Sequence, residues 1–214
     1  MKITILNSTA DHPVNTWLKK WIQKHQNNHQ ISLVRSKQEI DKGDILFLIS
    51  CSELIAKQDR ERYKKTLVIH ASDLPKGRGW SPHIWEIIHG ADEITLSLLE
   101  AVDEVDSGDI WKKIKVNIPK TALYNTINAL IFDAELELMD FAIEKFSTIK
   151  PQKQNDEINP TYWPKRKPED SEVDVSKSIA EQFDLIRVCD PNRFPAFFFI
   201  DGKKFIIKIE VADE

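Results

Sequence analysis

Two side chains suited to acid–base chemistry each follow a predicted strand. His70 ends the apolar run Thr66–His70, and Asp106 opens the turn that follows a second run, Ile94–Ala101. In an open α/β sheet ligands bind beyond the carboxyl ends of the strands, so the two side chains can converge if the strands are neighbours. A carboxylate facing an imidazole holds one tautomer and raises the basicity of the other nitrogen, which suits proton transfer near neutral pH.

Taken singly, these features have ordinary explanations. A histidine at a strand end is more often a structural residue bonded to backbone, and Asp-Ser-Gly-Asp at 106–109 is most often only a turn. The loop between them adds weight. Residues 71–82 read Ala-Ser-Asp-Leu-Pro-Lys-Gly-Arg-Gly-Trp-Ser-Pro, a sequence that positions backbone groups tightly and packs little. The combination therefore indicates a functional site.

A metal centre is the alternative chemistry for this region. The candidate ligands are His70, His83, His89, Asp106 and Asp109. No pair of them has the i, i+4 spacing of a zinc-binding helix, and both cysteines lie elsewhere in the chain. We therefore expect no metal.

Several nucleotide and hydrolase motifs are absent. The first strand is followed by Asn-Ser-Thr-Ala-Asp at 7–11 rather than by GxGxxG, which disfavours NAD and FAD. The sequence also lacks GxxxxGK[ST] and GxSxG, which disfavours a P-loop and a nucleophile elbow.

The elements that must position these residues alternate between strand and helix, as in an α/β fold with a mostly parallel central sheet flanked by helices. Predicted strands are Lys2–Asn7, Ile31–Arg35, Asp44–Ser50, Thr66–His70, Ile94–Ala101 and Ile110–Ile118; predicted helices are Pro13–Gln26, Ser81–His89, Thr121–Phe146 and Ser176–Val188. In the last helix we expect Ser176 as N-cap and Ile179, Phe183 and Ile186 inward. A hairpin with Asp-Gly at its turn follows over 197–207.

Residues 1–150 are interpreted as a catalytic core, and 151–214 as a loop, helix and hairpin subdomain that completes the substrate site. In this subdomain 152–174 is rich in proline, charge and amide residues, which predicts an extended loop on the surface or over a site.

The composition excludes several classes of protein. The chain has 214 residues, 30 Lys+Arg against 34 Asp+Glu, a formal net charge of -4 and 2 cysteines. It can bury a core, has no disulfide framework, and shows no apolar run long enough for a signal peptide or membrane span. We expect a cytoplasmic protein that binds neither nucleic acid nor membrane.

The block from residue 68 to 109 resembles the folate-dependent formyltransferase family, which includes methionyl-tRNA formyltransferase and the sugar N-formyltransferases. His70 matches the family histidine, 72–75 and 78–79 match its loop, and Asp106 matches its catalytic aspartate. The stretches 163–170 and 193–197 look like the compact sugar branch, which is similar to the formylation domain of a gramicidin synthetase. The resemblance implies a Rossmann-like fold and 10-formyltetrahydrofolate as formyl donor.

One position departs from the family pattern. Val68 stands where the family has an asparagine whose amide helps to hold the formyl oxygen. Loss of such a donor costs about 3–4 kcal/mol where it has been removed from a comparable site. Either His70 works alone with backbone amides, or Ser50, Ser72 or His83 substitutes.

The resemblance also implies roles for individual residues. His70 exchanges the proton of the attacking amine, and Asp106 orients His70. Residues expected to bind the cofactor are Ser50, Cys51, Ser72, Val102 and Val105. Residues expected to bind the acceptor are Lys76, Arg78, Tyr162, Trp163, Arg187, Asn192 and Arg193. Loop bracing is the alternative for Arg78, loop anchoring for the two aromatic residues, and a surface ion pair for Arg187 and Arg193.

The implied activity is transfer of a formyl group to the amine of a nucleotide-linked amino sugar, a UDP- or dTDP-4-amino-deoxysugar, with the pseudaminic acid type as the narrower expectation. The alternatives are formylation of an aminoacyl group on a carrier protein or tRNA, and a non-catalytic folate or sugar-nucleotide binding module. A tRNA substrate calls for a basic C-terminal region, but acidic residues outnumber basic ones over 147–214. The apolar terminal hairpin offers an edge for a homodimer.

Overall fold

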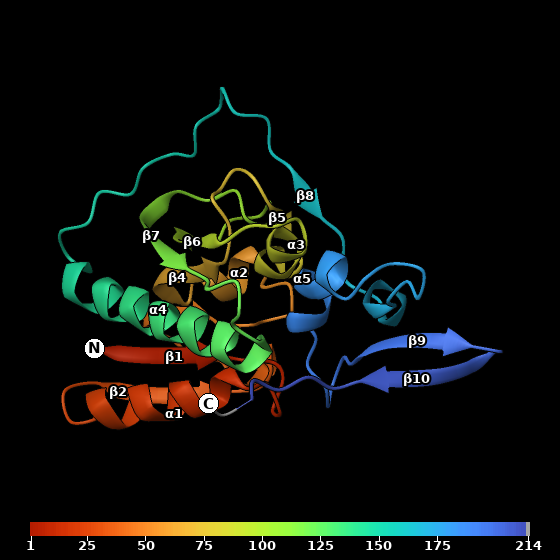
Figure 1. Cartoon of the computed structure of the whole chain (residues 1–214). Helices are drawn as coiled ribbons and strands as arrows, with labels where there is room; N and C mark the ends of the chain where they lie inside the picture. The colour runs from red at the N-terminus through yellow and green to blue at the C-terminus, as the bar shows by residue number, and fades with distance from the viewer. Residues whose placement is uncertain (213–214) are drawn as a thin grey trace.

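The computed structural model describes residues 1–212 and is built around one six-stranded sheet (Figure 1). The strand order is β2-β1-β3-β4-β6-β7. These strands are β1 (Lys2–Leu6), β2 (Gln30–Val34), β3 (Gly43–Leu48), β4 (Tyr63–His70), β6 (Glu93–Glu100) and β7 (Ile110–Asn117). Only β6 runs against the others, since it pairs antiparallel with both β4 and β7. The predicted α/β fold with a mostly parallel sheet is confirmed.

The central strands are buried on both faces. In β1 and β3 the side chains of Ile3, Ile5, Ile45 and Phe47 on one face, and of Leu6 and Leu46 on the other, have no exposed surface. Their near-continuous apolar runs follow from this double burial, because a parallel strand between two layers has no polar face.

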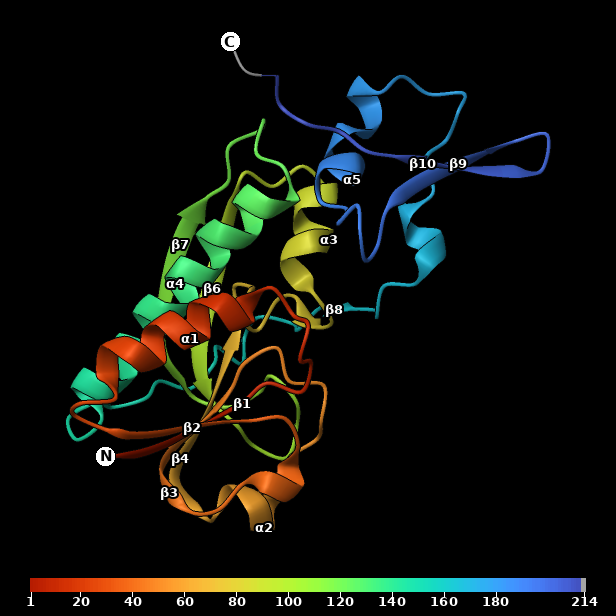
Figure 2. The ribbon, with the colours of Figure 1, turned by 90° about the horizontal axis from the view of Figure 1, so that it is seen from below.

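Helices α1 and α4 lie side by side over one face of the sheet (Figure 2). The indole nitrogens of Trp17 and Trp21 donate hydrogen bonds of 2.7 Å to Asp133 and Asp140 of α4, respectively. The α-helices are α1 (Val14–His25), α2 (Lys57–Arg60), α3 (Pro82–Ile88), α4 (Tyr124–Lys145) and α5 (Phe183–Arg187), with 3₁₀ helices at Lys37–Glu39, Pro168–Ser171 and Ala180–Gln182. Within residues 1–212, no helix combines the length and apolar character needed to cross a membrane.

After α4 the chain returns across the sheet as an extended segment, residues 151–163, which we call the strap (Figure 1). Gln152 forms a β-bridge with Ile110, and β8 (Tyr162–Trp163) pairs in parallel with β5 (Arg78–Gly79). The strap therefore joins the end of the core to the loop that follows His70. The division into units near residue 150 stays a prediction.

The helix predicted over 176–188 is wrong in its first half. Only Ala180–Gln182 and α5 are helical, and Ile179 is 70% exposed rather than inward. Asp174 Oδ1 accepts hydrogen bonds from both the backbone N–H and the hydroxyl of Ser176, and Glu181 binds Ser178 in the same way. These local side-chain bonds replace the helical ones. Ile186 is buried, as expected.

The terminal hairpin consists of β9 (Ala196–Ile200) and β10 (Lys203–Ile207), as predicted, and it projects from the body of the molecule (Figures 1 and 2). Its turn residues Asp201 and Gly202 both have positive φ, 50° and 73°, the combination that a two-residue turn of type I′ requires.

Candidate active site

The imidazole of His70 lies between two oxygen acceptors. Its Nδ1 is 3.5 Å from Asp106 Oδ1, and its Nε2 is 2.8 Å from the carbonyl oxygen of Gly77. Because a carbonyl only accepts, Nε2 carries a hydrogen and Nδ1 is the nitrogen that the carboxylate faces. Both side chains are largely buried, with 9% of His70 and 6% of Asp106 exposed. The predicted His–Asp pair is therefore formed, but the other ring nitrogen, Nε2, is not the free base that was expected, because it donates to Gly77.

The two residues meet although β4 and β6 are antiparallel. His70 is paired with Ser97 of β6, while the carboxyl end of β6 lies beside Leu67. The loop after β6 must therefore turn back along the sheet to bring Asp106 to His70. At Gly108 this loop passes close to the backbone of β6. A Cβ added at Gly108 would lie 1.8 Å from the carbonyl oxygen of Glu100, so only glycine fits.

Asp106 sits in a left-handed backbone conformation with φ of 58°. Its Oδ2 accepts a 2.9 Å hydrogen bond from the N–H of Gly79. Gln154 of the strap donates from Nε2 to the carbonyl oxygens of Asp106 (2.7 Å) and Gly108 (3.1 Å). Gln154 was not predicted from the sequence, because no spacing rule links position 154 to a turn nearly fifty residues earlier.

Two loops with exposed apolar side chains flank this pair. The loop after β3 presents Leu54, 75% exposed, and the loop after β6 presents Val102 and Val105, 43% and 52% exposed. Arg60 of α2 bridges the loops, since it donates to the carbonyl oxygen of Ile55 and to the carboxylate of Asp103. Exposed apolar groups held on an ordered frame are typical of a site for a flat organic ligand.

A family model described as "Formyl transferase" matches residues 4–143, which includes both His70 and Asp106. The chain belongs to the formyl transferase family. Members of this family use 10-formyltetrahydrofolate. The expected family resemblance, fold and formyl donor are thus confirmed at the level of the family.

Individual relatives carry two kinds of name. The methionyl-tRNA formyltransferase of Bacillus velezensis is 30% identical over 167 residues, 74% of this chain and 52% of that protein. A solved methionyl-tRNA formyltransferase from Clostridium thermocellum has a TM-score of 0.78 at 23% identity and covers 97% of both chains. A 4-N formyltransferase from Francisella tularensis has a TM-score of 0.73 at 19% identity, covering 100% of this chain and 98% of that one. The chain spans about half the length of the curated relatives it matches.

Most residues that the formyl transferase resemblance assigned to the cofactor lie on the two flanking loops. Ser50 is exposed, with a φ of 46°, and Val102 and Val105 are open to solvent. Cys51 is half-buried, and burial raises the pKa of its thiol. The prediction for Ser72 is wrong. It has no exposed surface, and its side chain packs directly under Gly77.

Arg78 has a structural role rather than the predicted role in acceptor binding. It is 8% exposed and donates to Glu104 Oε1 (2.7 Å), the Tyr162 hydroxyl (3.2 Å) and Gln154 Oε1 (3.0 Å). Its guanidinium is therefore committed to bracing the loop, which was the alternative interpretation.

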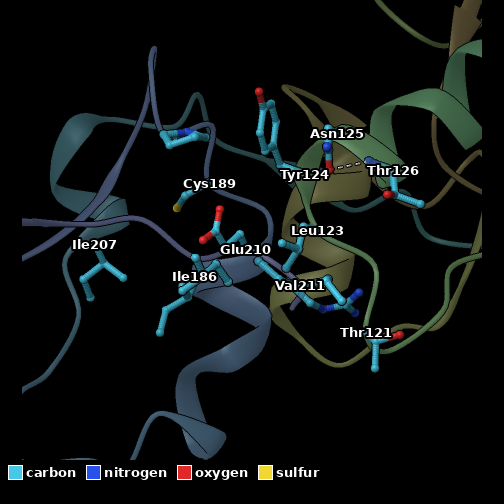
Figure 3. A pocket seen from close by; sticks show the side chains of 13 residues that line it. Thr121, Leu123, Tyr124, Asn125, Thr126, Ile186, Cys189, Ile207, Glu210 and Val211 are labelled. Atoms are coloured by element: carbon cyan, nitrogen blue, oxygen red, sulfur yellow. Dashed lines mark hydrogen bonds between the residues drawn. The ribbon is translucent and has the colours of Figure 1, made fainter. Parts of the chain in front are cut away.

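Arg187 is also misassigned. It is 1% exposed, its Nε donates to Asp184 (2.6 Å), and its Nη1 donates to the carbonyl oxygens of Pro119 and Ala122. Arg187 forms part of the wall of a cavity of about 360 Å³ between the start of α4, α5 and the chain after β10 (Figure 3). None of the residues around this cavity belongs to the His70 site. Its Nε and Nη1 are held by protein acceptors, and the guanidinium lies at this separate cavity rather than at the His70 site.

The two aromatic residues of β8 differ. Tyr162 is 60% exposed and free to contact an acceptor on one side. Trp163 is half-buried and stacks on Trp85, with ring centroids 5.8 Å apart and planes 12° apart, so it anchors the strap as the alternative interpretation held. Trp80 was missed: it is 43% exposed beside Gly79, with the ammonium of Lys165 4.7 Å from its ring centroid.

Basic side chains gather on the α3 side of His70. Burial, and then the charges of His70, His12 and Arg166, lower the pKa of His83 to about 4. Burial and the charge of Arg193 lower the pKa of His12 to about 4. Both imidazoles are thus neutral at physiological pH, and Arg193 lies within electrostatic reach of this group.

The remaining predicted positions are open. Lys76 and Asn192 are exposed, and the backbone N–H of Asn192 donates to Asp190. In the described part of the chain, no three His, Cys, Asp or Glu side chains gather as a metal site would require.

Proposed function

We propose that this member of the formyl transferase family transfers the formyl group of 10-formyltetrahydrofolate to the amine of a nucleotide-linked amino sugar. The observation that carries the proposal is the His70–Asp106 pair, placed between two loops with exposed apolar side chains. The donor supplies an activated one-carbon group, and Leu54, Val102 and Val105 would hold its ring system.

The protein's own residues handle the proton. The attacking amine must lose a proton as it bonds to the formyl carbon. With the Nε2 hydrogen of His70 bonded to Gly77, the nitrogen that can accept this proton is Nδ1, beside Asp106. Asp106 orients the ring and stabilises its protonated form. The imidazole of His83 is the replacement that we favour for the family asparagine. Its Nδ1 is buried with no hydrogen-bond partner in the described part of the chain, and an uncharged ring can donate a hydrogen bond to a developing oxyanion.

The aromatic and basic surface next to this pair supports a nucleotide acceptor. Trp80 offers an exposed ring adjacent to Gly79, whose N–H binds Asp106, and Lys165 adds positive charge to it. A ring with a nearby ammonium suits a base and a diphosphate. The narrower expectation of a UDP- or dTDP-4-amino-deoxysugar rests on the sequence resemblance.

A second candidate, formylation of an aminoacyl group on tRNA or on a carrier protein, is favoured by the names of the relatives, including the Clostridium thermocellum structure of matching length. Against this candidate stands the excess of acidic over basic residues in 147–214, because phosphate-backbone binding needs clustered positive charge.

The test is to incubate the protein with 10-formyltetrahydrofolate and a panel of UDP- and dTDP-4-amino sugars, methionyl-tRNA and an aminoacyl carrier protein, and to follow the tetrahydrofolate formed. Turnover with a sugar that is lost in His70→Ala supports the proposal. Turnover confined to methionyl-tRNA or the carrier overturns the choice of acceptor. Donor binding without turnover on any acceptor favours the non-catalytic module.

We further propose that the terminal hairpin joins two copies of the chain. Phe199, Ile200, Phe205 and Ile206 are each more than 40% exposed on it. Light scattering should give a dimer for the native chain and a monomer for Phe205→Glu with Ile206→Lys. A native monomer at micromolar concentration contradicts this.

A further inference from the structure

Gln154 uses both ends of its side-chain amide, one on the turn that carries Asp106 and the other on Arg78. Its Nε2 donates two hydrogen bonds, to the carbonyl oxygens of Asp106 and Gly108, and its Oε1 accepts one from Arg78 Nη2. An amide nitrogen has two hydrogens, so both are used within this turn. The side chain is therefore engaged with the protein rather than poised for a ligand.

The turn that Gln154 holds is strained. Asp106 adopts a φ of 58°, a left-handed conformation that is unfavourable for a residue with a Cβ. This conformation directs Oδ2 to the N–H of Gly79 and Oδ1 to Nδ1 of His70. If the turn relaxed to negative φ, the carboxylate would swing away from both groups.

The other restraints on this turn act at different atoms. Gly79 binds the Asp106 carboxylate itself, and the N–H of Glu100 binds the carbonyl of Asp109 at the end of the turn. Gln154 is the residue of the strap that restrains the backbone of Asp106 directly. It also links this backbone to the buried Arg78, and through Arg78 to the loop that follows His70.

We propose that Gln154 is a positioning residue that keeps the Asp106 carboxylate against His70 during formyl transfer. The inference rests on the proposed formyl-transfer function and concerns a residue outside the segment that the family model matches. Gln154 acts through Asp106 and contacts neither donor nor acceptor.

Two substitutions of Gln154 distinguish the contributions of its hydrogen-bond donors, its acceptor and its shape. Gln154→Glu keeps the shape and the acceptor for Arg78 but removes both donors and faces two carbonyl oxygens with a carboxylate. Gln154→Met keeps the length without charge or hydrogen bonds. Gln152→Glu is the matched control, because Gln152 lies on the same strap, contacts Ile110 through its backbone, and has an exposed side chain.

Steady-state kinetics with the active acceptor supply the first readout. We expect kcat to fall about 10- to 100-fold in both Gln154 variants, as for other residues that orient a catalytic group, with the KM for 10-formyltetrahydrofolate changed less than about 3-fold. Gln152→Glu should match the native protein. If both Gln154 variants keep kcat within about 2-fold while their melting temperatures fall, the role is structural and the proposal is overturned.

The second readout needs no substrate and so survives failure of the proposed activity. The ¹⁵N resonances of the His70 ring report the group that Nδ1 faces. We expect both Gln154 variants to shift them towards their positions in Asp106→Asn, and Gln152→Glu to leave them in place. Resonances unchanged in folded Gln154→Met, confirmed by circular dichroism, would contradict the inference even if the protein formylates nothing.

Discussion

Nδ1 of His70 lies 3.5 Å from Oδ1 of Asp106. His70 ends β4 and Asp106 lies in the loop after β6, although the two strands run in opposite directions. The contact exists because the loop after β6 folds back beside the sheet. A carboxylate in this position orients the ring and compensates its charge when it takes up a proton.

The carboxylate charge of Asp106 is therefore expected to be essential. Asp106→Asn retains an oxygen for the N–H of Gly79 but removes the charge that faces His70, so the formyl transfer rate should fall about 10²- to 10⁴-fold without loss of fold. Asp109→Asn is the control from the same turn and should keep the native rate. Equal losses in the two variants would show that the turn, and not the carboxylate, matters.

Arg60 should control affinity for the donor. Arg60→Ala releases the loop after β3 from the loop after β6, because it removes the bonds to Ile55 and Asp103. Ordering these loops on binding would then raise the KM for 10-formyltetrahydrofolate by about 5- to 10-fold, with a smaller change in kcat. Lys57→Ala, an exposed position on the same helix, provides the control. A KM unchanged in Arg60→Ala would mean that the loops are ordered without the bridge.

Arg187 and Arg193 should separate stability from acceptor binding. Arg187→Leu leaves Asp184 and two backbone carbonyls unpaired and should lower the free energy of unfolding by about 2–3 kcal/mol, since Asp184 is partly exposed. Urea titration measures this loss. Arg193→Leu should change stability by less than about 0.5 kcal/mol while raising the KM for the acceptor. The reverse pattern would restore Arg187 as a ligand-binding residue.

Gly79 should be sensitive to any added side chain. Its φ is 98°, and a Cβ would lie 2.4 Å from the carbonyl oxygen of Trp163, so Gly79→Ala must open the pairing of β5 with β8. We expect a loss of about 2–3 kcal/mol and faster proteolysis within the strap. Gly90→Ala tests the cost of the backbone conformation alone, because Gly90 has a φ of 92° but nothing lies within 4 Å of an added Cβ. This substitution should lower the free energy of unfolding by about 1 kcal/mol. Similar losses at both sites would argue against the steric explanation.

Glu135 should make stability fall as the pH rises. Its carboxyl is buried in α4, and burial raises its pKa from 4.5 to about 8. Between these values the folded state keeps a proton that the unfolded state releases, so unfolding becomes easier with increasing pH. From pH 6.5 to 9 the loss should be about 2 kcal/mol, and it should be absent in Glu135→Gln. Urea unfolding at both pH values measures it. Glu137→Gln, an exposed neighbour, should retain the native slope.

Much of the fold follows from local pattern. The strands of the sheet and helices α1, α3 and α4 were predicted within a few residues, because double burial and helical periodicity are written in consecutive side chains. The prediction of a helix over 176–179 was wrong because the carboxylates of Asp174 and Glu181 accept hydrogen bonds from Ser176 and Ser178 in local turns. A polar run that favours a helix equally favours such bonds.

The α/β class, the family, and His70 and Asp106 as candidate catalytic residues were predictable from the sequence, because they depend on residue types within short motifs; their contact depends on the loop after β6. The burial of Arg78, Ser72 and Arg187, and the support that Gln154 and Arg60 give the site, became visible only in the folded chain. The physical reason is that an arginine or amide has the same character in any sequence, and its role depends on which distant backbone groups the fold leaves in need of a hydrogen-bond partner.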